Sequence, residues 1–134
     1  MIKGDSVLTD AKAFQSFSVD DLAKARAFYH DTLGLEVAER PEGLELEVGE
    51  GSKVFVYPKP DHKPATFTIL NFAVDNVDTA VDRLKATGIT FEKYDQPGIK
   101  TDERGIARDT GGPAMAWFKD PAGNILSVMQ SRGD

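Results

Sequence analysis

The stretches FSVDDLAKARAFYHDTLGLEV, residues 17–37, and FAVDNVDTAVDRLKATGITFE, residues 72–92, share one pattern, and this repeat decides the fold. Identical residues occupy equivalent positions in four pairs: Phe17 and Phe72, Val19 and Val74, Asp20 and Asp75, and Ala25 and Ala80. Gly34 and Gly88 also correspond, if the second stretch is allowed to be one residue shorter. Each stretch reads as a strand, a helix, a glycine and a second strand. The repeat therefore predicts two copies of one structural module.

The ends of the two helices can be placed from single residues. Asp21 and Asn76 suit the N-cap, because their side chains accept hydrogen bonds from the free N–H groups of the first turn. Gly34 and Gly88 suit the left-handed backbone conformation that ends a helix. Between these ends apolar residues recur at helical spacing, namely Leu22, Ala25, Tyr29 and Leu33 in the first stretch, and Val77, Ala80, Val81 and Leu84 in the second.

Short runs rich in β-branched and aromatic residues surround the helices and predict strands. They are AFQSFSV (13–19), LEVAER (35–40), LELEVG (44–49), KVFVYP (53–58), FTILNFAV (67–74), ITFEKY (89–94), GIARD (105–109), AMAWFK (114–119) and NILSVMQ (124–130). The turn DPAGN, 120–124, joins the last two strands, because Pro121 presets φ and Gly123 tolerates a positive φ. The polar, glycine-rich segment 95–113 is predicted to be a loop around one short strand.

These elements predict an α+β fold of two βαβββ modules, residues 12–58 and 66–131, joined by a linker at 59–65 within a single domain of residues 1–134. One module alone leaves one face of its sheet uncovered. Two modules can curl into a mixed sheet around a shared concave cavity, which is where a small ligand is expected.

Composition narrows the classes of function. The chain has 134 residues, 40% of them hydrophobic and 28% charged, which is typical of a globular protein with its own core. A net charge of −6 argues against a nucleic-acid partner. Without a bilayer-spanning apolar run or a signal peptide, no membrane partner and a cytoplasmic location are expected. The lack of cysteine excludes disulfides, thiolate metal sites and a cysteine nucleophile.

Three stretches together resemble the vicinal oxygen chelate superfamily: SVDDLAKARAFYHDTLGLEV (18–37), FAVDNVDTAVDRLKATGITF (72–91) and WFKDPAGNILSV (117–128). This superfamily includes glyoxalase I, extradiol dioxygenases, and fosfomycin- and bleomycin-resistance proteins, and the likeness extends over residues 14–130. The resemblance implies the glyoxalase/bleomycin resistance/dioxygenase fold, which has the paired βαβββ modules. It implies less about function, because the superfamily hosts several chemistries.

The resemblance also implies a metal held by one residue from the first strand and one from the last strand of each module. Those four positions correspond here to Phe14, Ile69, Phe55 and Ser127. Phenylalanine and isoleucine cannot ligate a metal and serine is a poor ligand, whereas a catalytic zinc or iron site needs about three N, O or S protein ligands. His30 and His62 are predicted to lie on the surface instead. The sequence therefore predicts no metal, no cofactor and no catalytic residue.

Because the usual metal ligands are missing, the sequence most resembles the bleomycin-resistance proteins of this superfamily, which bind a drug without transforming it. The resemblance predicts a metal-independent homodimer that binds a small molecule, with antibiotics among the candidates. The alternative is a lyase- or dioxygenase-like metalloenzyme of the glyoxalase type with non-standard ligands. A third hypothesis is a metal-free enzyme that uses a tyrosine or an arginine of the 95–113 loop, where Arg104 or Arg108 could meet an anionic group.

Residues that share a face with those four positions can be identified because strand side chains alternate. The predicted ligand pocket consists of Phe14, Ser16, Phe55, Tyr57, Ile69, Asn71, Met115, Trp117 and Ser127. Aromatic side chains with a few hydroxyls and one amide suit an aromatic or largely apolar ligand. The alternative is that Phe14 and Phe55 fill the cavity themselves.

Overall fold

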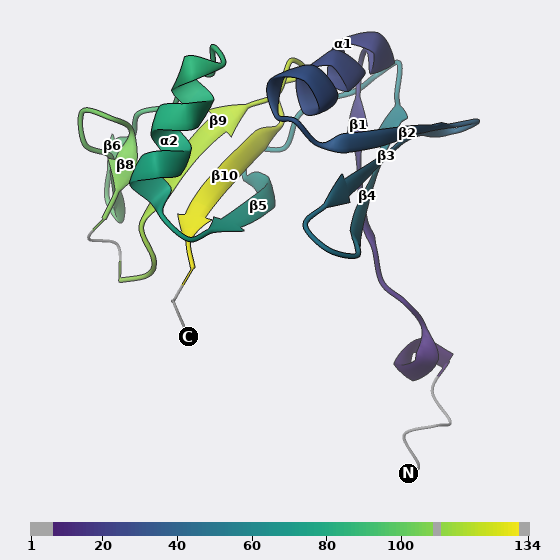
Figure 1. The fold of residues 1–134 in the computed structure, drawn as a ribbon, viewed down its shortest axis with the longest axis horizontal. Helices are drawn as coiled ribbons and strands as arrows, with labels where there is room; N and C mark the ends of the chain where they lie inside the picture. The colour runs from purple at the N-terminus through teal and green to yellow at the C-terminus, as the bar shows by residue number, and fades with distance from the viewer. Residues whose placement is uncertain (1–6, 109–110, 132–134) are drawn as a thin grey trace.

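Figure 1 shows the computed structural model, which describes residues 7–108 and 111–131. The first half contains the 3-10 helix η2 (Val7–Asp10), β1 (Gln15–Val19), α1 (Leu22–Arg26), the π-helical segment η3 (Ala27–Thr32), β2 (Glu36–Arg40), β3 (Gly43–Val48) and β4 (Ser52–Pro58). The second half contains β5 (Thr68–Val74), α2 (Val77–Ala86), β6 (Asp95–Gln96), β7 (Ile99–Lys100), β8 (Ile106–Ala107), β9 (Met115–Lys119) and β10 (Ile125–Gln130).

Each module forms its own four-stranded mixed sheet. The strand order is β1-β4-β3-β2 in the first, here sheet A, and β5-β10-β9-β8 in the second, sheet B. The pairs β1–β4 and β5–β10 are parallel, and the other neighbours are antiparallel. Strands β6 and β7 form a separate hairpin. The predicted α+β fold of two βαβββ modules is confirmed, with two distinct sheets in place of one.

The helix ends fall where the sequence predicts them. The side chains of Asp21 and Asn76 each accept a hydrogen bond from the backbone N–H three residues further on, at 3.1 Å and 2.9 Å. Gly34 and Gly88 follow the helices with φ of 77° and 101°, values that residues with a Cβ rarely adopt. Local side-chain chemistry therefore sets both ends of each helix.

The one-residue difference between the two repeats is located in η3. There the backbone N–H of Leu33 donates to the carbonyl of Phe28, five residues earlier, at 2.9 Å. A π-helical hydrogen bond spans five residues, whereas an α-helical one spans four, so a π-helical turn holds one residue more. The extra residue of module one is absorbed in this way, and Ala25 and Gly34 keep the roles of their counterparts in module two.

The helices cover one face of each sheet, and a hydrophobic core lies beneath them. The strand residues of this core are Phe17, Val19, Leu44, Leu46, Val54 and Val56 in sheet A, and Leu70, Ile106, Ala116, Phe118, Leu126 and Val128 in sheet B. Ala25, Tyr29, Val77 and Val81 complete this core from the helical segments. The opposite face of each sheet has no described helix over it, and in sheet A we call it the open face.

The modules meet where the first helical segment reaches the turn between β9 and β10. The hydroxyl of Tyr29 donates to Oδ2 of Asp120 at 2.7 Å, and both side chains are buried. Nδ2 of Asn124 donates to the backbone carbonyl of Ser18 at 2.9 Å. These bonds connect the modules through the DPAGN turn, so the turn does more than join two strands.

The strand predicted at 89–94 is wrong. The short strand β8 occupies the place beside β9, where it pairs with Ala116 and Met115. The segment 89–94 is instead held against β9 by a hydrogen bond from the backbone N–H of Glu92 to the carbonyl of Trp117, at 2.8 Å. The strand predicted at 105–109 is shortened to β8, and residue 109 lies outside the described residues.

Residues 7–14 extend from the start of β1 away from both sheets (Figure 1). The side chains of Val7, Leu8 and Phe14 in this arm are largely exposed. Among the described residues, no helix has the length and apolar character needed to cross a membrane.

Candidate functional site

The open face of sheet A carries four of the predicted pocket residues. On β1 and β4, Ser16 pairs with Phe55, and Ser18 pairs with Tyr57. Phe14 precedes β1 by one residue and shares the parity of Ser16. Phe55 and Tyr57 alternate with the buried Val54 and Val56, and Ser16 precedes the buried Phe17, so these side chains lie on the side that a ligand can reach.

A groove of about 580 Å³ runs along this face. Phe14 is 72% exposed and Phe55 is half-buried, so both rings offer apolar area to a ligand. The volume falls within the range of small-molecule sites. The residues lining the groove are Lys12, Ala13, Phe14, Glu42, Glu45, Gly51, Lys53, Val54 and Phe55.

Glu45 lies beside Phe55 on the floor of the groove. Its Oε2 accepts hydrogen bonds from Nη2 of Arg40 at 3.1 Å and from Nζ of Lys53 at 3.3 Å. These bonds, with that from Arg40 the stronger influence, lower the pKa of Glu45. At neutral pH the floor therefore holds a carboxylate with two cationic partners.

The corresponding face of sheet B is closed by its own side chains. Trp117 is 8% exposed and donates through Nε1 to Oγ1 of Thr68 at 3.1 Å. The ring of Tyr94 packs edge-on against it, with centroids 5.4 Å apart. Ser127 is fully buried, and its hydroxyl donates to Oδ1 of Asn71. The polar groups on this face are thus already paired with one another.

The nine predicted pocket residues are divided between the two sheets. Phe14 and Phe55 line the sheet A groove, with Ser16 and Tyr57 on the same face. The sequence left two alternatives for Phe14 and Phe55, an open cavity and one that these rings fill. In the structure both rings border a groove of about 580 Å³ on sheet A. Sheet B holds the remaining five residues, Ile69, Asn71, Met115, Trp117 and Ser127.

The sequence did not identify the charged residues of the groove. They are Lys12, Glu42, Glu45 and Lys53. The alternation in LELEVG places its glutamates on one face of the strand and its leucines on the other, and this pattern could have identified Glu45 as a residue of the open face. Lys12 comes from the arm, Glu42 from a turn and Lys53 from the start of β4, and they share one groove only once β1, β3 and β4 are aligned.

His62 differs from its predicted surface position. It is half-buried in the linker, with Nδ1 2.7 Å from Oγ of Ser18 and Nε2 3.1 Å from the carbonyl oxygen of Ala122. The imidazole therefore ties the linker to β1 and to the β9–β10 turn. His30 is exposed.

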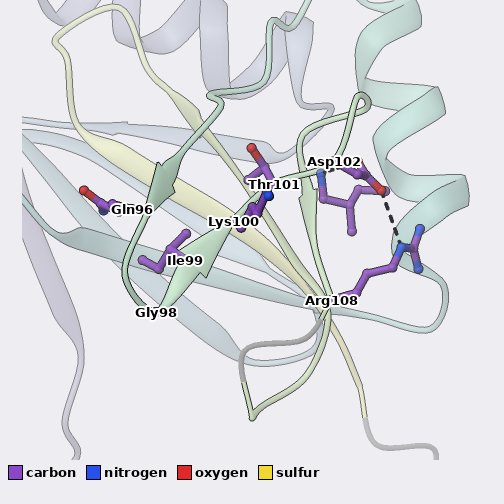
Figure 2. A pocket seen from close by; sticks show the side chains of 8 residues that line it. Gln96, Gly98, Ile99, Lys100, Thr101, Asp102 and Arg108 are labelled. Carbon is purple, nitrogen blue, oxygen red and sulfur yellow. Dashed lines mark hydrogen bonds and ion pairs between the residues drawn. The ribbon is translucent and has the colours of Figure 1, made fainter.

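A second groove, of about 510 Å³, lies beside the β6–β7 hairpin (Figure 2). Its walls include Ile99 and Ile106, together with the cationic side chain of Arg108. That guanidinium lies 3.5 Å from Oδ2 of Asp102 and 2.5 Å from Oδ1 of Asp78. The charge of Arg108 is therefore already matched within the protein.

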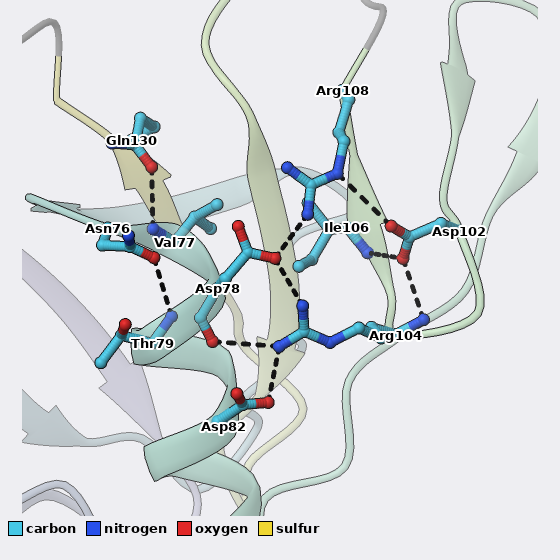
Figure 3. A network of polar contacts seen from close by, with 10 residues as sticks. All are labelled: Asn76, Val77, Asp78, Thr79, Asp82, Asp102, Arg104, Ile106, Arg108 and Gln130. Carbon is cyan, nitrogen blue, oxygen red and sulfur yellow. Dashed lines mark hydrogen bonds and ion pairs between the residues drawn. The ribbon is translucent and has the colours of Figure 1, made fainter.

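Figure 3 shows the network to which Arg108 belongs. Arg104 donates to Oδ1 of Asp78 at 2.5 Å and to Oδ1 of Asp82 at 2.6 Å. The two arginines thus fasten the loop before β9 to helix α2. Neither lines the sheet A groove, although the sequence suggested them as partners for an anionic ligand.

A family model described as the Glyoxalase/Bleomycin resistance protein/Dioxygenase superfamily matches residues 13–128. The chain belongs to this superfamily. The matched residues include nearly all of both modules, which agrees with the resemblance noted from the repeat. A comparison with curated proteins finds no match.

Solved structures of the same fold include proteins with different functions. A bleomycin-binding protein in complex with bleomycin is 22% identical with a TM-score of 0.69, over 91% of this chain and 99% of that chain. Lactoylglutathione lyase from Agrobacterium tumefaciens is 24% identical with a TM-score of 0.65, over 92% and 95%. An antibiotic binding protein from a Streptomyces species is 26% identical with a TM-score of 0.59, over 90% and 97%.

The residues at the positions where the resemblance implies a metal do not fit one. Phe14, Phe55 and Ile69 carry no ligating side-chain atom, and the Ser127 hydroxyl is buried against Asn71. Within residues 7–108 and 111–131, no three His, Asp or Glu side chains gather in a way that could hold a metal ion. The chain has the fold of the superfamily, but the side chains at these four positions are unsuited to binding a metal ion.

Proposed function

We propose that this protein is a metal-independent binding protein for a small, aromatic or largely apolar molecule, held in the sheet A groove. The observation that carries the proposal is the pair Phe14 and Phe55, whose rings border one accessible groove. Exposed aromatic area in a concave site favours planar apolar ligands, because such a ligand removes both surfaces from water.

The names of two solved neighbours support the proposal. One is a bleomycin-binding protein and the other an antibiotic binding protein, and each covers about nine-tenths of this chain. The metalloenzyme alternative has support from the lyase of the same fold. It lacks support from the site itself, since Phe14 and Ile69 stand where ligands are required.

A direct test combines metal content with ligand binding. We expect protein purified without a histidine tag to contain far less than one equivalent of zinc, nickel, iron or manganese by mass spectrometry. A panel of aromatic drugs should yield binders by isothermal titration calorimetry, with Kd unchanged by EDTA. Phe55→Ala should weaken such a binder on the order of tenfold, because a buried aromatic contact is lost.

The matched control is Phe67→Ala, which removes a phenylalanine that is 67% exposed and outside the groove. It should leave Kd unchanged. Near-stoichiometric metal, or loss of binding in EDTA, would favour the metalloenzyme alternative. Equal affinity of Phe55→Ala and the wild type would move the site away from sheet A.

We further propose that the protein is a homodimer. Val7 and Leu8, in the arm before β1, are the two most exposed large apolar side chains among the described residues. Such side chains suit contact with a second copy. Sedimentation velocity should give a dimer at micromolar concentration, and Leu8→Asp should shift the distribution toward the monomer. A monomer at all concentrations would contradict the proposal.

A further inference from the structure

The charged ends of the sheet A groove lie at opposite ends of strand β3. Strands β1 and β4 are parallel and start together, with Gln15 beside Val54. Lys12 and Lys53 precede these two residues, so both lysines lie at that end of the sheet. Lys53 also pairs with Glu47 near the end of β3.

Glu42 lies at the other end of the groove. It belongs to the turn between β2 and β3. The next residue, Gly43, starts β3 and pairs with Arg40, the last residue of β2. The following residue, Leu44, pairs with Val56 near the end of β4. From Glu47 back to Glu42 is five residues, which corresponds to roughly 16 Å of strand.

The charged residues of the groove differ in whether they form ion pairs within the protein. Glu45, between them, bonds to Arg40 and Lys53. Among the described residues, Lys12 and Glu42 have no ion-pair partner within 4.0 Å. Two lysines lie at one end of the groove, and Lys53 shares Glu45 with Arg40. Of the described residues that line the groove, Glu42 is the one carboxylate at the other end.

From this arrangement we infer that the groove selects an elongated aromatic zwitterion. Its anionic group would meet Lys12 and Lys53, its aromatic body would lie against Phe14 and Phe55, and its cationic group would meet Glu42. The inference rests on the proposed function and specifies the ligand class of the same groove. Because two lysines face one end of the ligand and one glutamate faces the other, an aromatic anion should bind better than the matching cation.

Three biphenyl probes of equal core test this order. They are 4′-(aminomethyl)biphenyl-4-carboxylic acid, biphenyl-4-carboxylate and 4-(aminomethyl)biphenyl, titrated at pH 7 by calorimetry. We expect the zwitterion to bind on the order of threefold more tightly than the anion, and on the order of tenfold more tightly than the cation, as exposed charge pairs contribute little each. In 1 M NaCl the differences should largely vanish, because salt screens exposed charges.

Charge variants assign the two ends. Glu42→Gln should remove the advantage of the zwitterion over the anion, and Lys12→Gln should remove most of the advantage of the anion over the cation. Glu103→Gln and Lys63→Gln change the net charge equally at exposed positions outside the groove, and they should leave the order of affinities unchanged.

The outcomes separate this inference from the proposed function. Equal affinity of the three probes, all weakened by Phe55→Ala, would overturn the ligand class and leave the aromatic binding site standing. Tighter binding of the cation than of the zwitterion would overturn the assignment of the ends. Absence of binding by all three probes at millimolar concentration, while the drug panel yields a binder that depends on Phe55, would also overturn the ligand class.

Discussion

Replacement of Asp120 by alanine is expected to lower the free energy of unfolding by about 3 to 4 kcal/mol, because several buried donors lose their acceptor. Its carboxylate accepts from the Tyr29 hydroxyl at 2.7 Å, from the backbone N–H groups of Ala122 and Asn124 at 3.0 Å and 2.8 Å, and from Nδ2 of Asn124 at 3.0 Å. The side chain is 4% exposed, so water cannot easily replace these bonds. Urea denaturation followed by circular dichroism measures the loss.

Two further variants show how much of this loss of unfolding free energy comes from the buried hydrogen bonds. Tyr29→Phe removes one donor and should cost about 1 to 2 kcal/mol. Burial, together with the nearby charge of Asp120, raises the pKa of the Tyr29 phenol, so the hydroxyl stays protonated and donates throughout the neutral range. Asp75→Ala, at an exposed aspartate, should change the unfolding free energy by less than about 0.5 kcal/mol. Comparable losses for Asp75→Ala and Asp120→Ala would contradict the role of the buried network.

Replacement of Phe118 by alanine is expected to cost about 3 to 5 kcal/mol of unfolding free energy, the usual range for a large aromatic side chain removed from a core. Phe118 is 1% exposed. Its ring contacts Phe28 of module one, with centroids 6.4 Å apart, and Phe91 of module two, at 5.6 Å. The vacated space would therefore lie where the two modules meet.

Chemical denaturation and thermal melting both report this loss. Phe67→Ala is the matched control, because it deletes the same side chain at a position that is 67% exposed. We expect it to cost less than about 1 kcal/mol. A Phe118→Ala protein that unfolds at the same urea concentration as the Phe67→Ala protein would show that the contact between modules contributes little.

Features that depend on neighbours along the chain could be predicted from the amino-acid sequence. Asp21 and Asn76 cap the helices, and Gly34 and Gly88 end them, because each acts on backbone groups within a few residues. The repeat predicted the two modules. Even the shorter second repeat has a local cause, the π-helical segment η3 of module one.

Contacts between segments far apart in the chain could be read only from the folded structure. Residues 89–94 have the composition of a strand, yet β8 holds the edge of β9, and sequence composition carries no information on that competition. His62, predicted on the surface, contacts Ser18 and Ala122 from distant parts of the chain.

In the sheet A groove, too, some features could be predicted from the sequence and others depend on the folded structure. Alternation along each strand correctly separated Phe55 from the buried Val54 and Val56, since side-chain parity is a property of one strand. The charged ends depend on the register of three strands, which places Lys12 with Lys53 and leaves Glu42 at the far end of β3. Register is set by packing between strands, so the sequence contains the groove residues while only the fold brings them to one surface.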